Sequence, residues 1–258
     1  MLLLVALLPI IVPLVLLAVF KLSARVAMSI TAVLIVASAS LVWGMQADAL
    51  AASALQGVHR ALTIVWILIG AITLLYTIQD SGAVKSIRAG FMKISEDMRV
   101  QVVIIGFAFL AMIEGVSGFG TPAVIVAPLL ITLGFRPIVA ATIALVSDTV
   151  ACTFGAGALP LILGLENVTV YGPELIQQVA NLVTTYDLLI GTLMPLGLVY
   201  ILVVWFGKGS RRGRLRDVAS IAPWVLMVGL TYSITAYVSV RLIGVEFASV
   251  LAGLVSMW

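Results

Sequence analysis

Long apolar segments, separated by short charged or polar ones, dominate the chain. Five uninterrupted runs cover about residues 2–20, 26–44, 61–79, 186–206 and 221–240, and each is close to the roughly 20 residues that a helix needs to cross a bilayer. A further run at 247–258 has only 12 residues and is too short to span. The stretch from about 101 to 165 is also apolar, but glycine, proline and polar residues interrupt it twice. The pattern predicts an all-α polytopic membrane protein.

Composition supports this class. Of 258 residues, 63% are hydrophobic and 10% are charged, whereas a soluble domain has roughly 25% charged residues. A water-soluble enzyme or a nucleic-acid binder is therefore excluded, and the net charge of +3 comes from basic residues between apolar runs. The single cysteine, Cys152, excludes a disulfide within the chain, and the single histidine, His59, argues against a histidine-based metal site. We expect no metal and no cofactor.

The basic residues predict which loops face the cytoplasm. Lysine and arginine gather in the segments 21–25, 80–100 and 207–217, whereas 45–60 has only Arg60 and 166–185 has neither. Under the positive-inside rule, the first three segments lie on the inner side of the cell membrane and the last two on the outer side. Apolar residues at helical spacing within 166–185 indicate a short interfacial helix there.

The first interruption predicts a re-entrant helical hairpin over about 101–133. Thirteen apolar-type residues, from 101 to 113, precede the segment EGVSGFGTP at 114–122. Thirteen helical residues reach about 20 Å, short of the roughly 30 Å of hydrocarbon, and the glycines and the proline oppose a continuous helix. Thr121 suits an N-cap and Pro122 a first helical position. The following backbone N–H groups would form an anion site near mid-membrane.

The second interruption predicts a broken helix over about 138–165. The segment SDTVACTFGAGALP at 147–160 divides this apolar run, and we expect the chain to unwind around Phe154–Gly157. A re-entrant hairpin together with a discontinuous helix is how many secondary transporters build a binding site at mid-membrane.

Two acids and several small polar residues in these interruptions are the candidate functional residues. Carboxyl groups at membrane depth are costly and mark functional sites by default, so Glu114 and Asp148 are candidates for proton coupling; the alternative is that both only cap backbone N–H groups. We expect the substrate site to be lined by Ser117, Gly118, Gly120, Thr121, Thr149, Thr153 and Gly155. Phe119 and Phe154 are expected to pack against neighbouring helices. The segment at 115–118 also matches the G-x-S-G of intramembrane serine proteases, but His59 lies at a membrane edge, so we do not expect an enzyme.

The sequence EGVSGFGTPAVIVAPLLITLGFRP, at 114–137, closely resembles the hallmark of the L-lactate permease family, E-G-x-x-G-F-G-x-P followed by A-x-L-L-x-x-L-G-F. The segment at 76–109 resembles the family's preceding loop and half-helix, and 149–160 resembles its T-A-P-x-x-F-G-A-x-G-x-P element. The resemblance implies import of lactate, and often glycolate, together with protons across the bacterial inner membrane. Family members are about twice as long, so residues 1–258 are expected to form a single transmembrane domain, the N-terminal half of a longer transporter.

Two departures from the family pattern bear on the site. The family has Asn-Thr-Ala-Pro where this chain has an acid at Asp148, and a glycine of its Phe-Gly-Ala-x-Gly element is displaced by one position, to Gly157. An acid repels a carboxylate substrate when ionised but can add a titrating group. The hypothesis is that backbone N–H groups after Pro122 bind the substrate carboxylate while protonation of Glu114 or Asp148 offsets its charge. The alternatives are an ion/proton antiporter of similar architecture and a non-transporting half, completed by a missing C-terminal half or a second copy.

Overall fold

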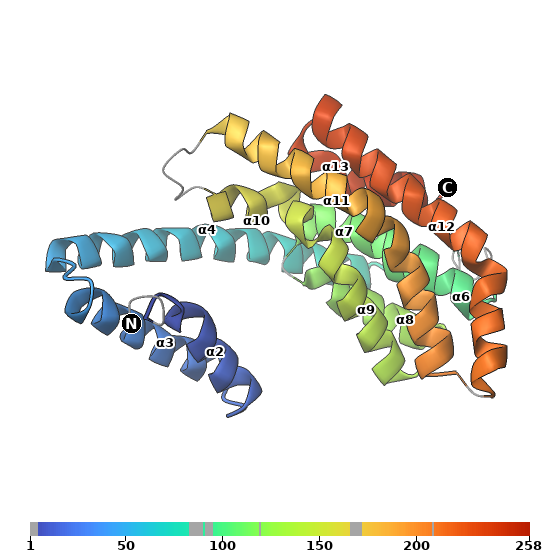
Figure 1. Ribbon diagram of the computed structural model, residues 1–258, viewed down its shortest axis with the longest axis horizontal. Helices are drawn as coiled ribbons and strands as arrows, with labels where there is room; N and C mark the ends of the chain where they lie inside the picture. Colours follow the sequence, from blue (N-terminus) through green and yellow to red (C-terminus); the bar gives the residue numbers. More distant parts are fainter. Residues whose placement is uncertain (1–4, 83–89, 91–94, 119, 166–171, 208) are drawn as a thin grey trace. The chain divides into compact units, whose positions relative to one another are not determined.

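A computed structural model describes residues 5–82, 90, 95–118, 120–165, 172–207 and 209–258. Within these ranges every regular element is helical, and the chain divides into two compact units, residues 1–66 and 67–258 (Figure 1). Phe119 and the predicted inner-loop residues Lys85, Arg88 and Lys93 lie outside the described residues. The all-α polytopic class predicted from the apolar runs is confirmed.

The first unit contains α2 (Leu8–Ala18), α3 (Ala24–Leu41) and the first part of α4 (Ala47–Asp80). Helices α2 and α3 pack against each other, joined by a tight turn in which Lys21 has a φ of +52°. Most of their large apolar side chains, such as Leu14 and Val33, are exposed. Apolar side chains that face outward are expected of helices in contact with lipid.

One continuous helix, α4, includes both a segment that was predicted as an outer loop and the predicted span that follows it. It has 34 residues and contains both most of the 45–60 segment, expected as an outer loop, and the apolar run 61–79. The loop prediction was wrong because it followed polarity alone. The segment from 47 to 60 is rich in alanine and leucine, residues with the strongest helix propensity.

The second unit is built around one long buried helix, formed by α6 (Met98–Gln101), the π-helical segment η1 (Val102–Phe109) and α7 (Leu110–Ser117). Most residues of this 20-residue helix are buried. It packs against α8 (Thr121–Thr132), α9 (Pro137–Ala151), α11 (Pro173–Tyr200), α12 (Arg211–Leu242) and α13 (Ala248–Ser256). In Figure 1 it runs between α8 and α9 on one side and α11 and α12 on the other. Buried side chains such as Phe107 and Tyr232, whose ring centroids are 4.9 Å apart, fill the core.

The chain reverses after α7, because α8 packs back along both α7 and η1. Both ends of this hairpin line one cavity, since Met98 and Arg99 at its start face Phe135 and Arg136 just after its end. The predicted hairpin over 101–133 is therefore present. Its first arm is longer than expected: with 20 residues it is long and apolar enough to span a membrane, so the argument from a 13-residue arm was wrong. The helix continues through Glu114 and Gly115 because α13 packs closely on Gly115, where an added Cβ would lie 2.7 Å from the backbone nitrogen of Val250.

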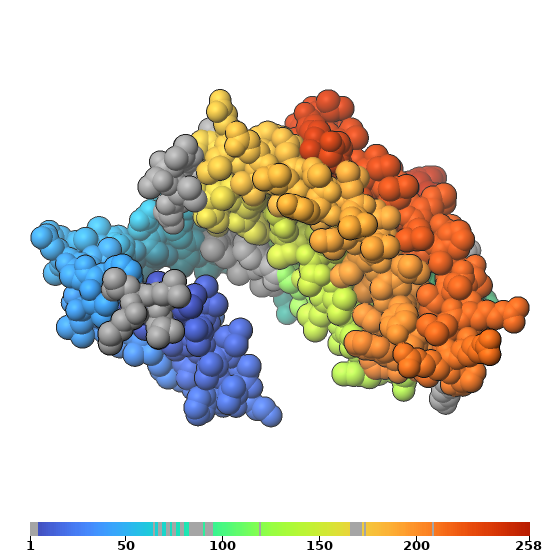
Figure 2. Space-filling model, in the orientation of Figure 1, coloured from blue at the N-terminus to red at the C-terminus, as the bar shows by residue number. Residues whose placement is uncertain are grey.

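Helices α11 and α12 pack together as an antiparallel pair (Figure 1), and in Figure 2 both contribute to the visible face of the unit. The pair approaches closely at Gly229, where an added Cβ would lie 3.0 Å from Cα of Thr192. Helix α11 begins at Pro173, so no separate interfacial helix exists in 172–185; the apolar spacing there belongs to the long α11. Among the described residues, five helices are long and apolar enough to cross a membrane, namely Ala24–Leu41, Met98–Ser117, Pro137–Leu165, Glu174–Trp205 and Arg211–Leu242.

Candidate functional site

The first helix break is short and depends on two glycines. Helix α7 ends at Ser117, and Gly118 follows with φ +59° and ψ −166°, a backbone conformation open essentially to glycine alone. Gly120 has φ +74° and is the N-cap of α8, so Thr121 is the first helical residue and Pro122 the second. The N-cap, predicted at Thr121, is therefore one residue earlier, at Gly120. A glycine takes that position because its backbone is left-handed.

The second break lies in the predicted broken helix. After α9 the chain forms one 3₁₀ turn, η2 (Cys152–Phe154), and then passes into α10 (Gly155–Leu165). Three consecutive residues at the start of α10 are left-handed, with φ of +46° at Ala156, +67° at Gly157 and +61° at Ala158. Alanine in this region costs roughly 1–2 kcal/mol per residue, so the surrounding packing must hold the segment in place. Phe154, 2% exposed, packs in an apolar cluster with Ala158 and Leu161, as expected.

The two breaks touch each other. A Cβ added to Gly118 would lie 2.7 Å from Cβ of Ala156 and 2.8 Å from its backbone nitrogen, so no side chain fits between them. On the same side, the carboxyl group of Glu114 packs directly against Gly155. Glycine at 118 and 155 therefore allows the two interrupted helices to meet.

Both candidate acids lie at this junction. The carboxyl groups of Glu114 and Asp148 lie within hydrogen-bonding reach of each other, although they come from different helices. Glu114 is 1% exposed, and Asp148 is partly buried, with Oδ2 about 4.0 Å from a Cβ added to Gly120. Two carboxyl groups this close favour a state in which they share one proton, because two negative charges would repel each other in a poorly solvated site.

Within the described part of the chain, both acids of the junction have a buried oxygen atom without a hydrogen-bond partner, and so does Ser147, the residue next to Asp148 in the chain. Among the described residues, five buried side-chain atoms lack a hydrogen-bond partner, and three of them are Glu114 Oε2, Asp148 Oδ1 and Ser147 Oγ. An unsatisfied buried polar group is destabilising by roughly 1–3 kcal/mol, and such groups call for an explanation, such as a ligand or bound water. The unpaired oxygen atoms of Glu114 and Asp148 make this junction a candidate site for a polar ligand.

The hydroxyl residues predicted to line the site are only partly gathered there. Ser117 is buried beside the first break, and its Oγ donates to the carbonyl of Ile113 at 3.0 Å. Thr121 is 8% exposed at the start of α8. Thr149 is exposed, and its hydroxyl group donates to the carbonyl of Val146, in its own helix, at 2.7 Å. Thr153 is partly buried in the 3₁₀ turn.

Three residues near the junction were not predicted from the sequence. Asp187 lies in the middle of the apolar helix α11, and was missed because its run was taken to begin at 186. Tyr232 is buried, with its hydroxyl group within hydrogen-bonding reach of Ser249. Ser249 in turn donates to the carbonyl of Ala151, just before the second break, at 3.3 Å. An acid inside an apolar run was the available signal for Asp187; nothing in the sequence brings the other two to the site.

The depth of the junction follows from helix geometry. Glu114 lies 16 residues from the first residue of α6 and Asp148 lies 11 residues from that of α9, and these two helix starts are at the same end of the unit. At the α-helical rise of 1.5 Å per residue, Asp148 is about 17 Å from that end, and Glu114 is less than about 24 Å from it because the π-helical η1 rises less per residue. Both values are less than the roughly 30 Å thickness of the hydrocarbon core.

Comparison with known proteins decides the family. The family model described as L-lactate permease matches residues 3–258. The chain belongs to the L-lactate permease family. Permeases are transporters, and the family together with the five spanning-length helices makes this a multi-pass protein of the cell membrane.

Individual permeases resemble the chain over nearly its whole length. Glycolate permease GlcA of Escherichia coli (strain K12) is 33% identical over 255 residues, which cover 98% of this chain and 43% of that protein. The L-lactate permease of Bacillus subtilis (strain 168) is 33% identical over 222 residues, 85% of this chain and 37% of that protein. The L-lactate permease of Salmonella typhi is 32% identical over 238 residues, 92% of this chain and 41% of that protein. The chain thus spans less than half the length of these relatives. No solved structure matches it.

Proposed function

We propose that this permease carries a small 2-hydroxy monocarboxylate, lactate or glycolate, across the cell membrane together with a proton. The observation that carries the proposal is the junction of the two helix breaks, where Glu114 and Asp148 meet and polar atoms stay buried without partners. The names of the relatives supply the substrate class, since they are glycolate and L-lactate permeases.

The chemistry of the junction suits a monocarboxylate. A helix start offers backbone N–H groups and a partial positive charge to an anion, and α8 begins at this junction, at Thr121. We propose that the substrate carboxylate binds there, while Ser147 Oγ, buried without a partner, accepts or donates a hydrogen bond to the 2-hydroxyl group. Direct recognition of that hydroxyl would separate lactate from propionate, because the analogue leaves a buried polar group unpaired.

Proton coupling follows from the cost of moving charge. A carboxylate that enters a weakly polar site next to two acids is strongly disfavoured unless a proton is retained. We propose that Glu114 carries this proton because it is the more deeply buried acid, and because the family pattern has an amide where this chain has Asp148. The loaded junction then holds one anion and one additional proton, and the neutral pair crosses.

The test is substrate counterflow in proteoliposomes. Vesicles loaded with unlabelled L-lactate should accumulate labelled lactate or glycolate transiently, and propionate should compete poorly. An ion/proton antiporter of the same architecture would give no counterflow. The fraction of the relatives' length that is covered, 37–43%, favours a second candidate, a half that does not transport alone. Purified, correctly inserted chain without counterflow would refute transport by these 258 residues and support that second candidate.

A further inference from the structure

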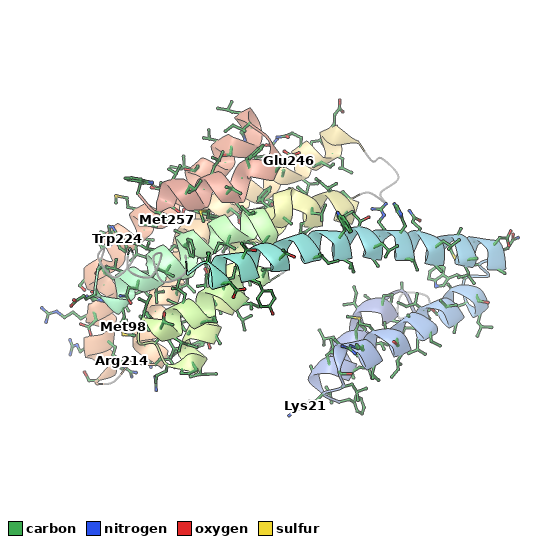
Figure 3. The ribbon with its side chains drawn as sticks, turned by 180° about the vertical axis from the view of Figure 1, so that it is seen from behind. Lys21, Met98, Arg214, Trp224, Glu246 and Met257 are labelled. Atoms are coloured by element: carbon green, nitrogen blue, oxygen red, sulfur yellow. The ribbon has the colours of Figure 1, made fainter. Side chains whose placement is uncertain are left out.

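Three arginines face one cavity at the end of the second unit opposite to the second break. The cavity has a volume of about 420 Å³ and is lined by Arg99, Arg136 and Arg214, which come from three separate segments of the chain. Figure 3 labels Met98 and Arg214 at this end of the unit, and Glu246 lies beyond the other end of α12. The positive-inside rule explains why basic residues lie at this end, but it does not require them to face a shared cavity.

Hydrogen bonds and packing hold the guanidinium groups of Arg136 and Arg214 in position. Arg136 donates to the carbonyl of Phe206 at 2.8 Å and lies over its ring, at 5.8 Å from the centroid. Arg214 donates through one terminal nitrogen to the carbonyls of Val204 and Gly207 at 2.6 and 3.1 Å. These contacts hold both side chains in place before any ligand binds, which lowers the entropy lost on binding.

Donors remain after these contacts. A guanidinium group has five N–H donors, and Nε of Arg214 is buried without a hydrogen-bond partner among the described residues. Arg99 is different, because it forms an ion pair with Asp97 at 2.6 Å and donates to the Asp217 carbonyl and to Ser220. The unused donors therefore belong mainly to Arg136, whose side chain is exposed, and to Arg214, whose buried Nε calls for an acceptor.

The charge and the walls of the cavity define the acceptor. Three arginines are opposed by two acids, Asp97 on Arg99 and Asp217 in the cavity wall, which leaves a single positive charge. Apolar side chains, including Phe135, Val139 and Leu202, form much of the remaining wall. A ligand with one negative charge and an apolar body matches both features.

We propose that this cavity binds the phosphate group of an anionic phospholipid of the inner leaflet, with Arg136 and Arg214 as the phosphate ligands and the apolar wall against the start of an acyl chain. A phosphodiester carries a single negative charge at neutral pH, and arginine binds phosphate oxygens through paired N–H groups. Lipid bound there would link the hairpin end, the start of α9 and the start of α12, and so stabilise this end of the unit. The proposal does not depend on the transported substrate.

Thermal unfolding of the purified chain in mixed micelles tests the proposal. Phosphatidylglycerol should raise the melting temperature more than phosphatidylcholine does, and inorganic phosphate at millimolar concentration should not reproduce the effect. Arg214→Gln and Arg136→Gln should each weaken the phosphatidylglycerol effect roughly tenfold in half-saturating lipid concentration, since a charge-assisted hydrogen bond is lost. Arg212→Gln is the matched control, because Arg212 is exposed, carries the same charge and does not line the cavity.

The outcomes separate the sources of the phosphate group. A phosphatidylglycerol effect that depends on Arg136 and Arg214 but not on Arg212 supports a lipid site. If inorganic phosphate had an equal effect, the proposed lipid would be wrong and the ligand would be a soluble phosphate compound. An equal loss in Arg212→Gln, or equal effects of the two lipids, would overturn the site itself and reduce the cluster to surface charge. Arg136 is exposed, so its variant keeps the test valid if Arg214→Gln does not fold.

Discussion

Substitution of Gly118 by alanine tests whether the two helix breaks depend on their mutual contact. The new Cβ would lie 2.7 Å from Cβ and 2.8 Å from the backbone nitrogen of Ala156, so backbone must move in at least one break. Overpacking of this kind costs about 1–3 kcal/mol. For a residue with a side chain, the φ of +59° with ψ of −166° adds about 1–3 kcal/mol of backbone strain. The free energy of unfolding should therefore fall by about 2–6 kcal/mol in total.

Gly120 provides the matched control. It also has a positive φ, +74°, but among the described residues beyond its chain neighbours the only atom within 4 Å of an added Cβ is Asp148 Oδ2, at 4.0 Å. Alanine there should cost only the backbone strain, about 1–2 kcal/mol. The assay is thermal unfolding of both variants in the same detergent. If Gly118→Ala is no less stable than Gly120→Ala, the two breaks do not meet as described.

Two further predictions concern the packing and the charged end of the second unit. Gly253→Ala should destabilise the chain by about 1–3 kcal/mol, because its Cβ would lie 2.5 Å from the backbone nitrogen of Met112. Gly164→Ala, in open space, should be neutral in the same unfolding assay. Equal melting temperatures of the two variants would contradict the close packing of α13 on α7. The Arg99 guanidinium holds the pKa of the Asp97 carboxyl below its usual value, so the ion pair stabilises the fold above the unfolded-state pKa of about 3.9 and this contribution is lost as pH falls through the folded-state pKa. Asp97→Asn should therefore lower the melting temperature at pH 7 and lose this effect progressively below about pH 4; a difference that stays constant with pH would refute the assignment.

Much of the fold could be predicted because glycine and proline mark where a helix cannot continue. The breaks near Gly118 and near Gly157 were both expected on that basis, and both are present. The position of a break was harder to predict, since Gly115 lies inside α7 although glycine weakens a helix. The close packing of α13 against this position, which leaves no room for a side chain, accounts for a glycine inside the helix.

The site itself depended on contacts that a sequence does not contain. Glu114 and Asp148 could be selected individually, because acids within apolar runs are rare, but their contact follows from how α7 and α9 cross. The left-handed conformation of two alanines could not be predicted either. Ala156 and Ala158 have a positive φ, which residues with a side chain rarely adopt, and no pattern in the sequence indicates this backbone in advance.

The most direct measurement of the central claim is net lactate uptake by Glu114→Gln in proteoliposomes with an imposed pH gradient. We expect acid outside to accelerate uptake by the unmodified chain and by Asp148→Asn, and we expect Glu114→Gln to reduce this acceleration by at least about tenfold. Glu114→Gln should retain lactate counterflow, because exchange needs the binding site but no net proton movement. Proton-driven uptake by Glu114→Gln at the rate of the unmodified chain would contradict the account.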